Sequence, residues 1–117
     1  MCPDSPSRQK SLAFAKRIVG VFNYLQTEKK EFVLSKQLLR CGTSIGANLA
    51  EAQYGSSRKD FLNKVYIALK ECAETLYWLE LLHSCEYLAE KEYQSLYSDC
   101  EELRKILSAI TKSTKNS

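Results

Sequence analysis

Turn-forming residues are scarce in this chain of 117 residues, which contains only four glycines and two prolines. Both prolines, Pro3 and Pro6, stand near the start of the sequence. All-β and loop-rich folds reverse direction often, and their turns depend on the backbone angles that glycine and proline supply. The scarcity argues against such folds and leaves long helices as the expected elements.

Long apolar runs are missing as well. No stretch approaches the roughly 20 apolar residues that a membrane-spanning helix needs, so no membrane association is expected. The number of cysteines is odd, no CxxC pair occurs and no apolar signal segment precedes them. These features are typical of a reducing compartment rather than of a disulfide framework, and they predict a cytoplasmic protein. The five cysteines are Cys2, Cys41, Cys72, Cys85 and Cys100.

The residue patterns of common enzyme sites are also absent. His83 is the only histidine, and its place near the end of a predicted helix favours a surface or carbonyl-capping role. No phosphate-binding GxxxxGK[ST] loop and no dinucleotide fingerprint occurs. Glu71 and Glu74 have the i, i+3 spacing of a di-iron carboxylate motif, but no histidine is available to complete it. We expect a protein that is not an enzyme and that binds no cofactor or metal.

Apolar residues recur with a period near 3.6 along most of the chain, which is the spacing of an amphipathic helix. With 44% apolar and 26% charged residues, the composition is that of a globular domain. Short loops and heptad-like spacing predict an all-α fold, an antiparallel up-and-down four-helix bundle over residues 8–112. A disordered lead at 1–7 and a frayed tail at 113–117 are expected to flank it. The predicted helices span about 8–27, 35 to a break at 54–57, 57–84 and 90–111.

Two serines are placed to begin helices. Ser35 is predicted as the N-cap of the second helix, because its hydroxyl can accept hydrogen bonds from the unpaired amides of the first turn. Ser57, with Asp60 three residues later, resembles a capping box at the start of the third helix. Gly55 suits the end of the second helix, where the backbone is often left-handed.

Charge is distributed unevenly along the chain. Residues 1–30 carry six basic and two acidic side chains, whereas residues 61–90 carry two basic and five acidic ones. A positive first helix could attract an acidic partner such as nucleic acid. Alternatively, the basic helix lies beside the acidic one and their electric fields largely cancel. The charge distribution taken by itself favours this alternative, because solvated helices normally have charged outer faces.

A polar stripe lies beside the apolar face of the second predicted helix. Arg40 and Glu51 are three turns apart, too far to pair on one helix, so each is expected to pair with another helix or another chain. The stripe is either a solvated face with weak ion pairs or a partly buried seam that fixes helix register or a subunit contact. We favour the seam, because Gly42 and Gly46 strip bulk from this helix and suggest close approach of another. The members of the stripe are Gln37, Arg40, Ser44, Asn48 and Glu51.

The stretch from Leu34 to Ala52, LSKQLLRCGTSIGANLAEA, is distinctive. It resembles helix 2 of the four-helix bundle family encoded by intervening sequences of bacterial large-subunit ribosomal RNA genes, which reads roughly S-x-Q-L-x-R-x-x-x-S-I-x-x-N-I-A-E-G. The segments 57–61 and 67–82 also look like this family. Ala52 departs from the usual glycine, and Lys70-Glu71 stands where many members have Gly-Ser. The matching positions are Ser35, Gln37, Leu38, Arg40, Ser44, Ile45, Asn48, Ala50 and Glu51.

The resemblance covers about residues 8 to 112 and implies an up-and-down bundle that assembles into a ring-like homopentamer. It also implies a distant kinship with accessory variability proteins of diversity-generating retroelements, which use a basic surface to bind nucleic acid. The family has no accepted molecular function that could be transferred to this chain.

Two functions therefore remain open. The first is an oligomer associated with RNA or DNA through a basic surface, which the resemblance and the basic first helix favour. The second is a protein–protein interaction scaffold whose tyrosine and tryptophan side chains form the contact, although the same side chains could form the self-association interface. Only nucleic-acid binding should fade steeply as salt rises. The candidate nucleic-acid-binding residues are Lys10, Lys16, Arg17, Lys29, Lys30 and Lys36.

Overall fold

The computed structural model describes residues 5–116, and this part of the chain is all-helical, with four helices and no strand. This confirms the prediction of an all-α fold with four helices. None of the four helices combines the length and the apolar character that crossing a bilayer requires. The helices are α1 (Pro6–Thr27), α2 (Leu34–Ala52), α3 (Arg58–Ser84) and α4 (Glu90–Asn116).

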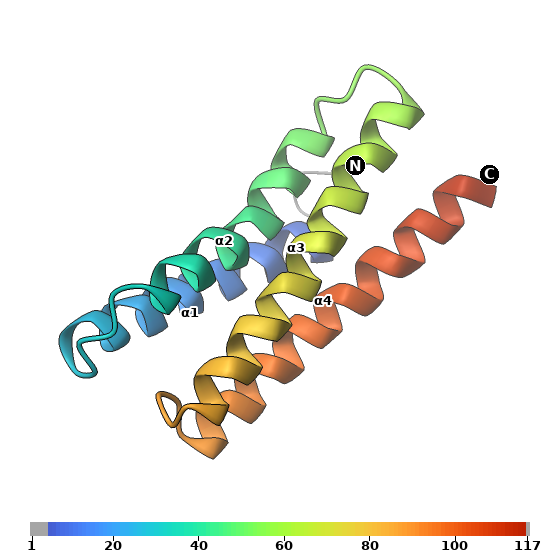
Figure 1. Ribbon diagram of the computed structural model, residues 1–117. Coiled ribbons are helices and arrows are strands. Elements are labelled where there is room, and N and C mark those ends of the chain that lie inside the picture. Colours follow the sequence, from blue (N-terminus) through green and yellow to red (C-terminus); the bar gives the residue numbers. More distant parts are fainter. Residues whose placement is uncertain (1–4, 117) are drawn as a thin grey trace.

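Each helix packs against the next one along the chain, and α1 also touches α4. The resulting molecule is elongated, with principal extents of 46, 21 and 20 Å. Figure 1 shows the α2–α3 loop and the end of α4 toward one end of this long body, and the α1–α2 and α3–α4 loops toward the other. The two ends therefore present different segments of the sequence to solvent.

The core runs along the inner faces of all four helices. Its side chains recur at alternating spacings of three and four residues, so that each helix turns one apolar stripe inward. Burying one large aliphatic side chain contributes about 1.5–3 kcal/mol, and this stripe is the main source of stability. The largest fully buried side chains are Phe14, Ile18, Leu25, Leu38, Ile45, Leu49, Val65, Leu79, Leu82, Leu96, Leu103 and Leu107.

The first and the last helix are longer than predicted. Helix α1 begins at Pro6 rather than near residue 8, because Ser5 caps it and accepts a hydrogen bond from the Arg8 amide at 3.4 Å. Proline suits the first helical position, where its missing N–H is not needed. Of the predicted disordered lead, residues 1–4 lie outside the described part of the chain. Helix α4 continues to Asn116, five residues beyond its predicted end.

The start of α2 differs from the prediction. Ser35 is not the N-cap, because it already lies inside the helix and its hydroxyl donates to the Glu31 carbonyl at 2.8 Å. The cap is instead the buried carboxylate of Glu31, which accepts from the amides of Val33, Leu34 and Ser35 at 3.1, 2.9 and 2.6 Å. Burial raises the pKa of Glu31, but the three amides outweigh it and hold that pKa below its ordinary value.

The start of α3 follows the prediction. Ser57 is the N-cap, and its hydroxyl accepts from the Asp60 amide at 3.1 Å. The Asp60 carboxylate accepts from the hydroxyl of Ser56, and its charge lies in the first turn, where the helix dipole favours an anion. The first turn of α3 is thereby fixed by residues that surround the α2–α3 loop.

Candidate functional site

Two of the six candidate nucleic-acid-binding residues are neutralised within the molecule. Lys10 donates to Glu102 of α4 at 3.0 Å, and Arg17 lies 2.7 Å from Asp99 and 3.5 Å from Glu92 on the same helix. Part of the basic face of α1 is thus paired with acidic side chains of α4. The acidic segment that the sequence singled out, residues 61–90, belongs mostly to α3, whose backbone is not a direct neighbour of α1. Cancellation of charge occurs, but with a different helix from the one expected.

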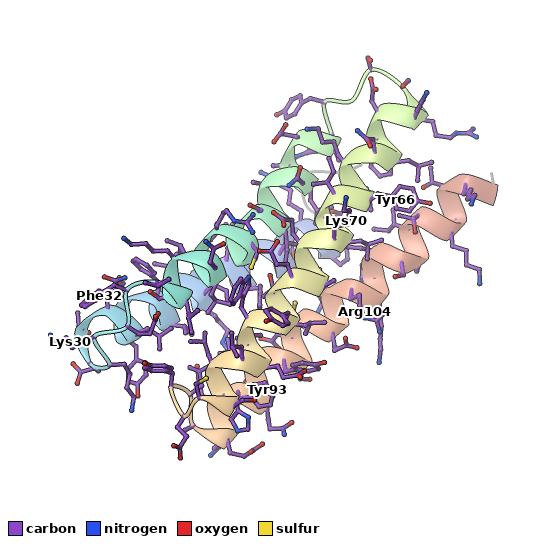
Figure 2. All side chains as sticks on the ribbon, viewed as in Figure 1. Lys30, Phe32, Tyr66, Lys70, Tyr93 and Arg104 are labelled. Carbon is purple, nitrogen blue, oxygen red and sulfur yellow. The ribbon has the colours of Figure 1, made fainter. Side chains whose placement is uncertain are left out.

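The other four candidates are exposed and form no ion pair with a described residue. Lys29 and Lys30 lie in the turn after α1, Lys36 lies in the first turn of α2, and Lys16 lies in the middle of α1. Figure 2 shows Lys30 in this turn next to Phe32. Three of the four therefore lie within residues 28–36, at the turn from α1 to α2. Glu28 and Glu31 in the same segment reduce its net positive charge.

The predicted polar stripe of α2 contacts α3 at both of its ends. The Arg40 guanidinium reaches Glu71 at 3.2 Å and also pairs with Glu74. At the other end, Lys64 of α3 donates to Glu51 at 2.9 Å. Both charged members of the stripe thus face a neighbouring helix of the same chain, at two heights along α3.

The uncharged members of the stripe bond within α2. Ser44 donates to the Arg40 carbonyl at 2.6 Å, and Asn48 donates to the Ser44 carbonyl at 2.8 Å. Both side chains are half-buried, whereas Gln37 is exposed. The idea that the stripe fixes register or a subunit contact therefore stays a prediction, resting on Arg40 and Glu51.

A tryptophan extends the Arg40 cluster along α3. The Trp78 indole donates to the Glu74 carboxylate at 3.0 Å. This hydrogen bond and that from Arg40 hold the pKa of the Glu74 carboxyl below its ordinary value. Tyr77, which is exposed, packs edge-on against the Trp78 ring with 5.1 Å between centroids. The cluster is a partly exposed ionic network whose carboxylates are occupied by their own neighbours.

The two glycines within α2 face α1 rather than the polar stripe. A Cβ at Gly42 would lie 2.9 Å from Ile18 Cγ1, and one at Gly46 would lie 3.3 Å from Ser11 Oγ. Glycine in a helix interior costs about 1 kcal/mol relative to alanine, and the close approach of α1 to α2 offsets that cost. The small residues that the sequence singled out in α2 therefore allow α1 to pack closely against this helix.

The buried thiols have the properties of core residues. Cys41, Cys72 and Cys100 are free and buried. Burial raises the pKa of Cys41 to about 11, and the hydrogen bond to Cys72 together with burial raises the pKa of Cys100. The thiols of Cys41 and Cys100 are therefore protonated at neutral pH and are poor nucleophiles. Within residues 5–116 no cluster of histidine, cysteine, aspartate and glutamate side chains has the geometry to hold a metal ion.

A cavity of about 440 Å³ lies between α1 and the α3–α4 loop. Val21, Tyr24 and Leu88 supply its apolar wall, and the ion pair between Arg17 and Glu92 borders it. The charged groups at its edge are therefore already paired with each other. His83 lies in the same half of the molecule, 3.0 Å from Glu90 and stacked on Tyr93 at 4.2 Å, which agrees with the surface role expected for it.

The sequence analysis did not assign the exposed side of α3 to nucleic-acid binding. Lys59 and Lys70 are exposed on this helix and form no ion pair with a described residue, and Tyr66 between them is 43% exposed. Figure 2 shows Tyr66 and Lys70 on neighbouring turns, far from Lys30. The spacing of four residues between Tyr66 and Lys70 is visible in the sequence, but only the packing of α3 shows that both side chains are exposed.

Three comparisons with known proteins bear on the chain. The sequence model of a family described as "23S rRNA-intervening sequence protein" matches residues 4–109. Among solved structures, the chain is similar to a protein of unknown function from the S23 ribosomal protein family of Bacteroides thetaiotaomicron VPI-5482. The two share 54% identity over 91% of this chain and 98% of that one, with a TM-score of 0.90. No curated protein matches the chain.

Proposed function

Because the chain belongs to the 23S rRNA-intervening sequence protein family, we propose that it is a non-enzymatic, oligomeric four-helix bundle that associates with RNA or DNA. The observation that carries the proposal is the set of exposed lysines without an ion pair to a described residue. Lysines that are not neutralised by their own chain can replace the counterions of a phosphate backbone. Of the sequence candidates, this set retains Lys16, Lys29, Lys30 and Lys36.

In this proposal the bundle is antiparallel and up-and-down. The ion pairs between neighbouring helices support this arrangement, because residue numbers increase along one helix where they decrease along the other. Lys10 and Arg17 of α1 pair with Glu102 and Asp99 of α4 in that reversed order. Between α2 and α3, the contacts of Arg40 and Glu51 run in the same reversed sense.

The proposal further includes a ring-like homo-oligomer, a pentamer by resemblance, located in the cytoplasm. A ring would repeat each exposed lysine around its axis, and repeated weak contacts raise the overall affinity for a long polyanion. Light scattering coupled to size-exclusion chromatography tests this part. A mass of five chains supports the pentamer, and a monomer at every concentration contradicts it.

The association with nucleic acid is tested by fluorescence anisotropy of labelled RNA and DNA, single-stranded and duplex, across a salt titration. The proposal expects micromolar or tighter binding at low salt, with affinity that falls steeply as salt rises. No binding to any of the four probes at low salt would overturn it.

A second candidate function is a protein–protein interaction scaffold. It is favoured by exposed apolar side chains, among them Leu12 at 58%, Val33 at 69% and Tyr77 at 58% exposure. A scaffold would retain its partner in high salt, because burial of apolar surface is not screened by ions. The same salt titration, run on a captured protein partner, separates the two functions.

A further inference from the structure

One exposed stripe of α3 combines positive charge with an aromatic ring. Lys59, Asn63, Tyr66 and Lys70 are all exposed, and their spacings of four, three and four residues place them on one face of the helix. With a rise of 1.5 Å per residue, the stripe is about 16 Å long. Neither lysine forms an ion pair with a described residue, so both charges face solvent.

Two adjacent surface depressions connect this stripe to the α2–α3 loop. One, of about 860 Å³, is bordered by Lys59 and Tyr66. The other, of about 390 Å³, is bordered by Tyr54 and Lys64. Asn63 borders both. Asp60, whose carboxylate accepts from Ser56, also borders both. Each depression therefore has one tyrosine and at least one basic side chain at its edge, and the two meet at Asp60 and Asn63.

The two tyrosines are exposed in different degrees. Tyr54, in the loop, is 85% exposed, and Tyr66, on the helix, is 43% exposed. A flat aromatic face open to solvent is a stacking surface for an unpaired base, and such stacking tolerates any base because each has a π-face. We call Tyr54, Lys59, Asn63, Tyr66 and Lys70 the α3 platform.

Charge around the platform is positive. Residues 51–74, which include the platform, and residues 105–115 at the end of α4 contain seven basic and four acidic side chains, a net charge of +3. The four acidic groups are engaged locally, since Glu51 pairs with Lys64, Asp60 accepts from Ser56, and Glu71 and Glu74 pair with Arg40. At the opposite end, residues 28–36 and 80–92 contain four basic and six acidic side chains, a net charge of −2.

We propose that the α3 platform binds single-stranded nucleic acid, with bases stacked on Tyr54 and Tyr66 and phosphates held by Lys59 and Lys70. This inference rests on the proposed association with nucleic acid and names both the strand form and the site. Single strands fit because their bases are free to stack, whereas a duplex offers only its backbone and grooves to such a surface. Asn63, at the junction of the two depressions, is placed to hydrogen-bond a base edge or a sugar.

The experiment is fluorescence anisotropy of the full chain with a labelled oligo(dT) strand and with a duplex of the same length. The double variant Tyr54→Ala/Tyr66→Ala should bind the single strand about 30-fold or more weakly, because it removes two stacked bases and each is worth roughly 1–3 kcal/mol. Tyr24→Ala is the matched control, since Tyr24 is 42% exposed on α1 and borders the cavity with Glu92. It should bind within about twofold of the parent chain.

Salt dependence provides a second measurement. The double variant Lys59→Gln/Lys70→Gln should lower the slope of log affinity against log salt by roughly 1.4, because each phosphate contact on a single strand contributes about 0.7. Lys29→Gln/Lys30→Gln, two exposed lysines at the opposite end, should leave the slope unchanged. Circular dichroism and thermal melting of each variant establish that it is folded before binding is measured.

The outcomes separate the platform from the broader proposal. Selective loss of single-strand affinity in the tyrosine variant supports the platform. Binding that is unchanged in both platform variants but lost in the Lys29/Lys30 variant overturns the platform and leaves nucleic-acid association standing. A duplex bound as tightly as the single strand, with no effect of the tyrosines, also overturns the platform. The absence of any binding by the parent chain overturns both.

Discussion

The two ends of the molecule use their charged residues differently. At the end formed by the α1–α2 and α3–α4 loops, Glu31 is buried under three amides, and Glu92 helps to neutralise Arg17. At the end formed by the α2–α3 loop and the last turns of α4, Lys59, Lys112 and Lys115 are exposed and form no ion pair with a described residue. At the first end the acidic side chains of Glu31 and Glu92 stabilise the fold, and the exposed Lys29, Lys30 and Lys36 lie in a region whose net charge is −2. The second leaves positive charge available to a partner.

The largest effect expected at the first end is loss of the α2 cap. Glu31→Gln removes a carboxylate that accepts three amide hydrogen bonds, and a hydrogen bond to a charged group contributes about 1.5–3 kcal/mol. We expect a loss of about 2–3 kcal/mol in the free energy of unfolding, measured by urea denaturation. Glu28→Gln is the control, since Glu28 is exposed in the same turn, and it should change stability by about 0.5 kcal/mol or less. Equal effects in the two variants would show that Glu31 is not the cap.

The same cap predicts a pH dependence of stability. The folded state lowers the pKa of Glu31, so the unfolded state takes up a proton first as the solution is acidified. The contribution of Glu31 is fully present above the pKa of an unfolded glutamate, about 4.3, and it is lost as pH falls through the lower pKa of the folded state. The stability difference between the parent chain and Glu31→Gln should therefore shrink below about pH 4. A difference that does not change between pH 7 and the acid limit would contradict this assignment.

Charge reversal compares the two ends directly. Lys59→Glu/Lys70→Glu should weaken single-strand binding roughly tenfold or more, because each reversed lysine removes a phosphate contact and adds repulsion. Lys29→Glu/Lys30→Glu makes the same change in net charge at the other end and should have less than a third of this effect. Anisotropy at one fixed low salt concentration measures both. Equal losses would mean that only net charge matters and that the ends do not differ.

The smallest effect is expected for Arg17, which the sequence assigned to nucleic-acid binding. Its guanidinium is held by Asp99 and Glu92, and partly exposed ion pairs of this kind contribute about 0–1 kcal/mol. Arg17→Gln should lower the free energy of unfolding by no more than that and leave nucleic-acid affinity within about twofold. A large loss of affinity with unchanged stability would return Arg17 to the binding surface.

The helices and the core could be predicted because both depend on local spacing. The 3.6-residue period of apolar side chains identifies all four helices, and Ser57 with Asp60 correctly marks the start of α3. The cap of α2 could not be predicted from the usual N-cap pattern. That pattern favours a serine such as Ser35 directly before the helix. Here the acceptor is the carboxylate of Glu31, which lies three residues before the helix and accepts from three successive amides.

The candidate site was harder to predict because folding decides which charged side chains are paired and which stay free for a partner. Sequence shows that α1 is basic, but only the packing of α1 beside α4 brings Glu102 to Lys10 and Asp99 to Arg17. Those pairs join residues more than 80 positions apart, beyond the reach of any local pattern. On α3, Lys64 pairs with Glu51, whereas Lys59 and Lys70 remain exposed because no described acidic side chain pairs with them.

Photo-crosslinking tests most directly whether the two ends differ in this way. A single strand carrying a photoreactive thymidine analogue is irradiated with the full chain at low salt, and the modified peptides are identified by mass spectrometry. The account predicts adducts within residues 54–70, on Tyr54, Tyr66 or their neighbours. Adducts confined to residues 16–36, with none on α3, would contradict it and assign nucleic-acid binding to the lysines around the α1–α2 turn.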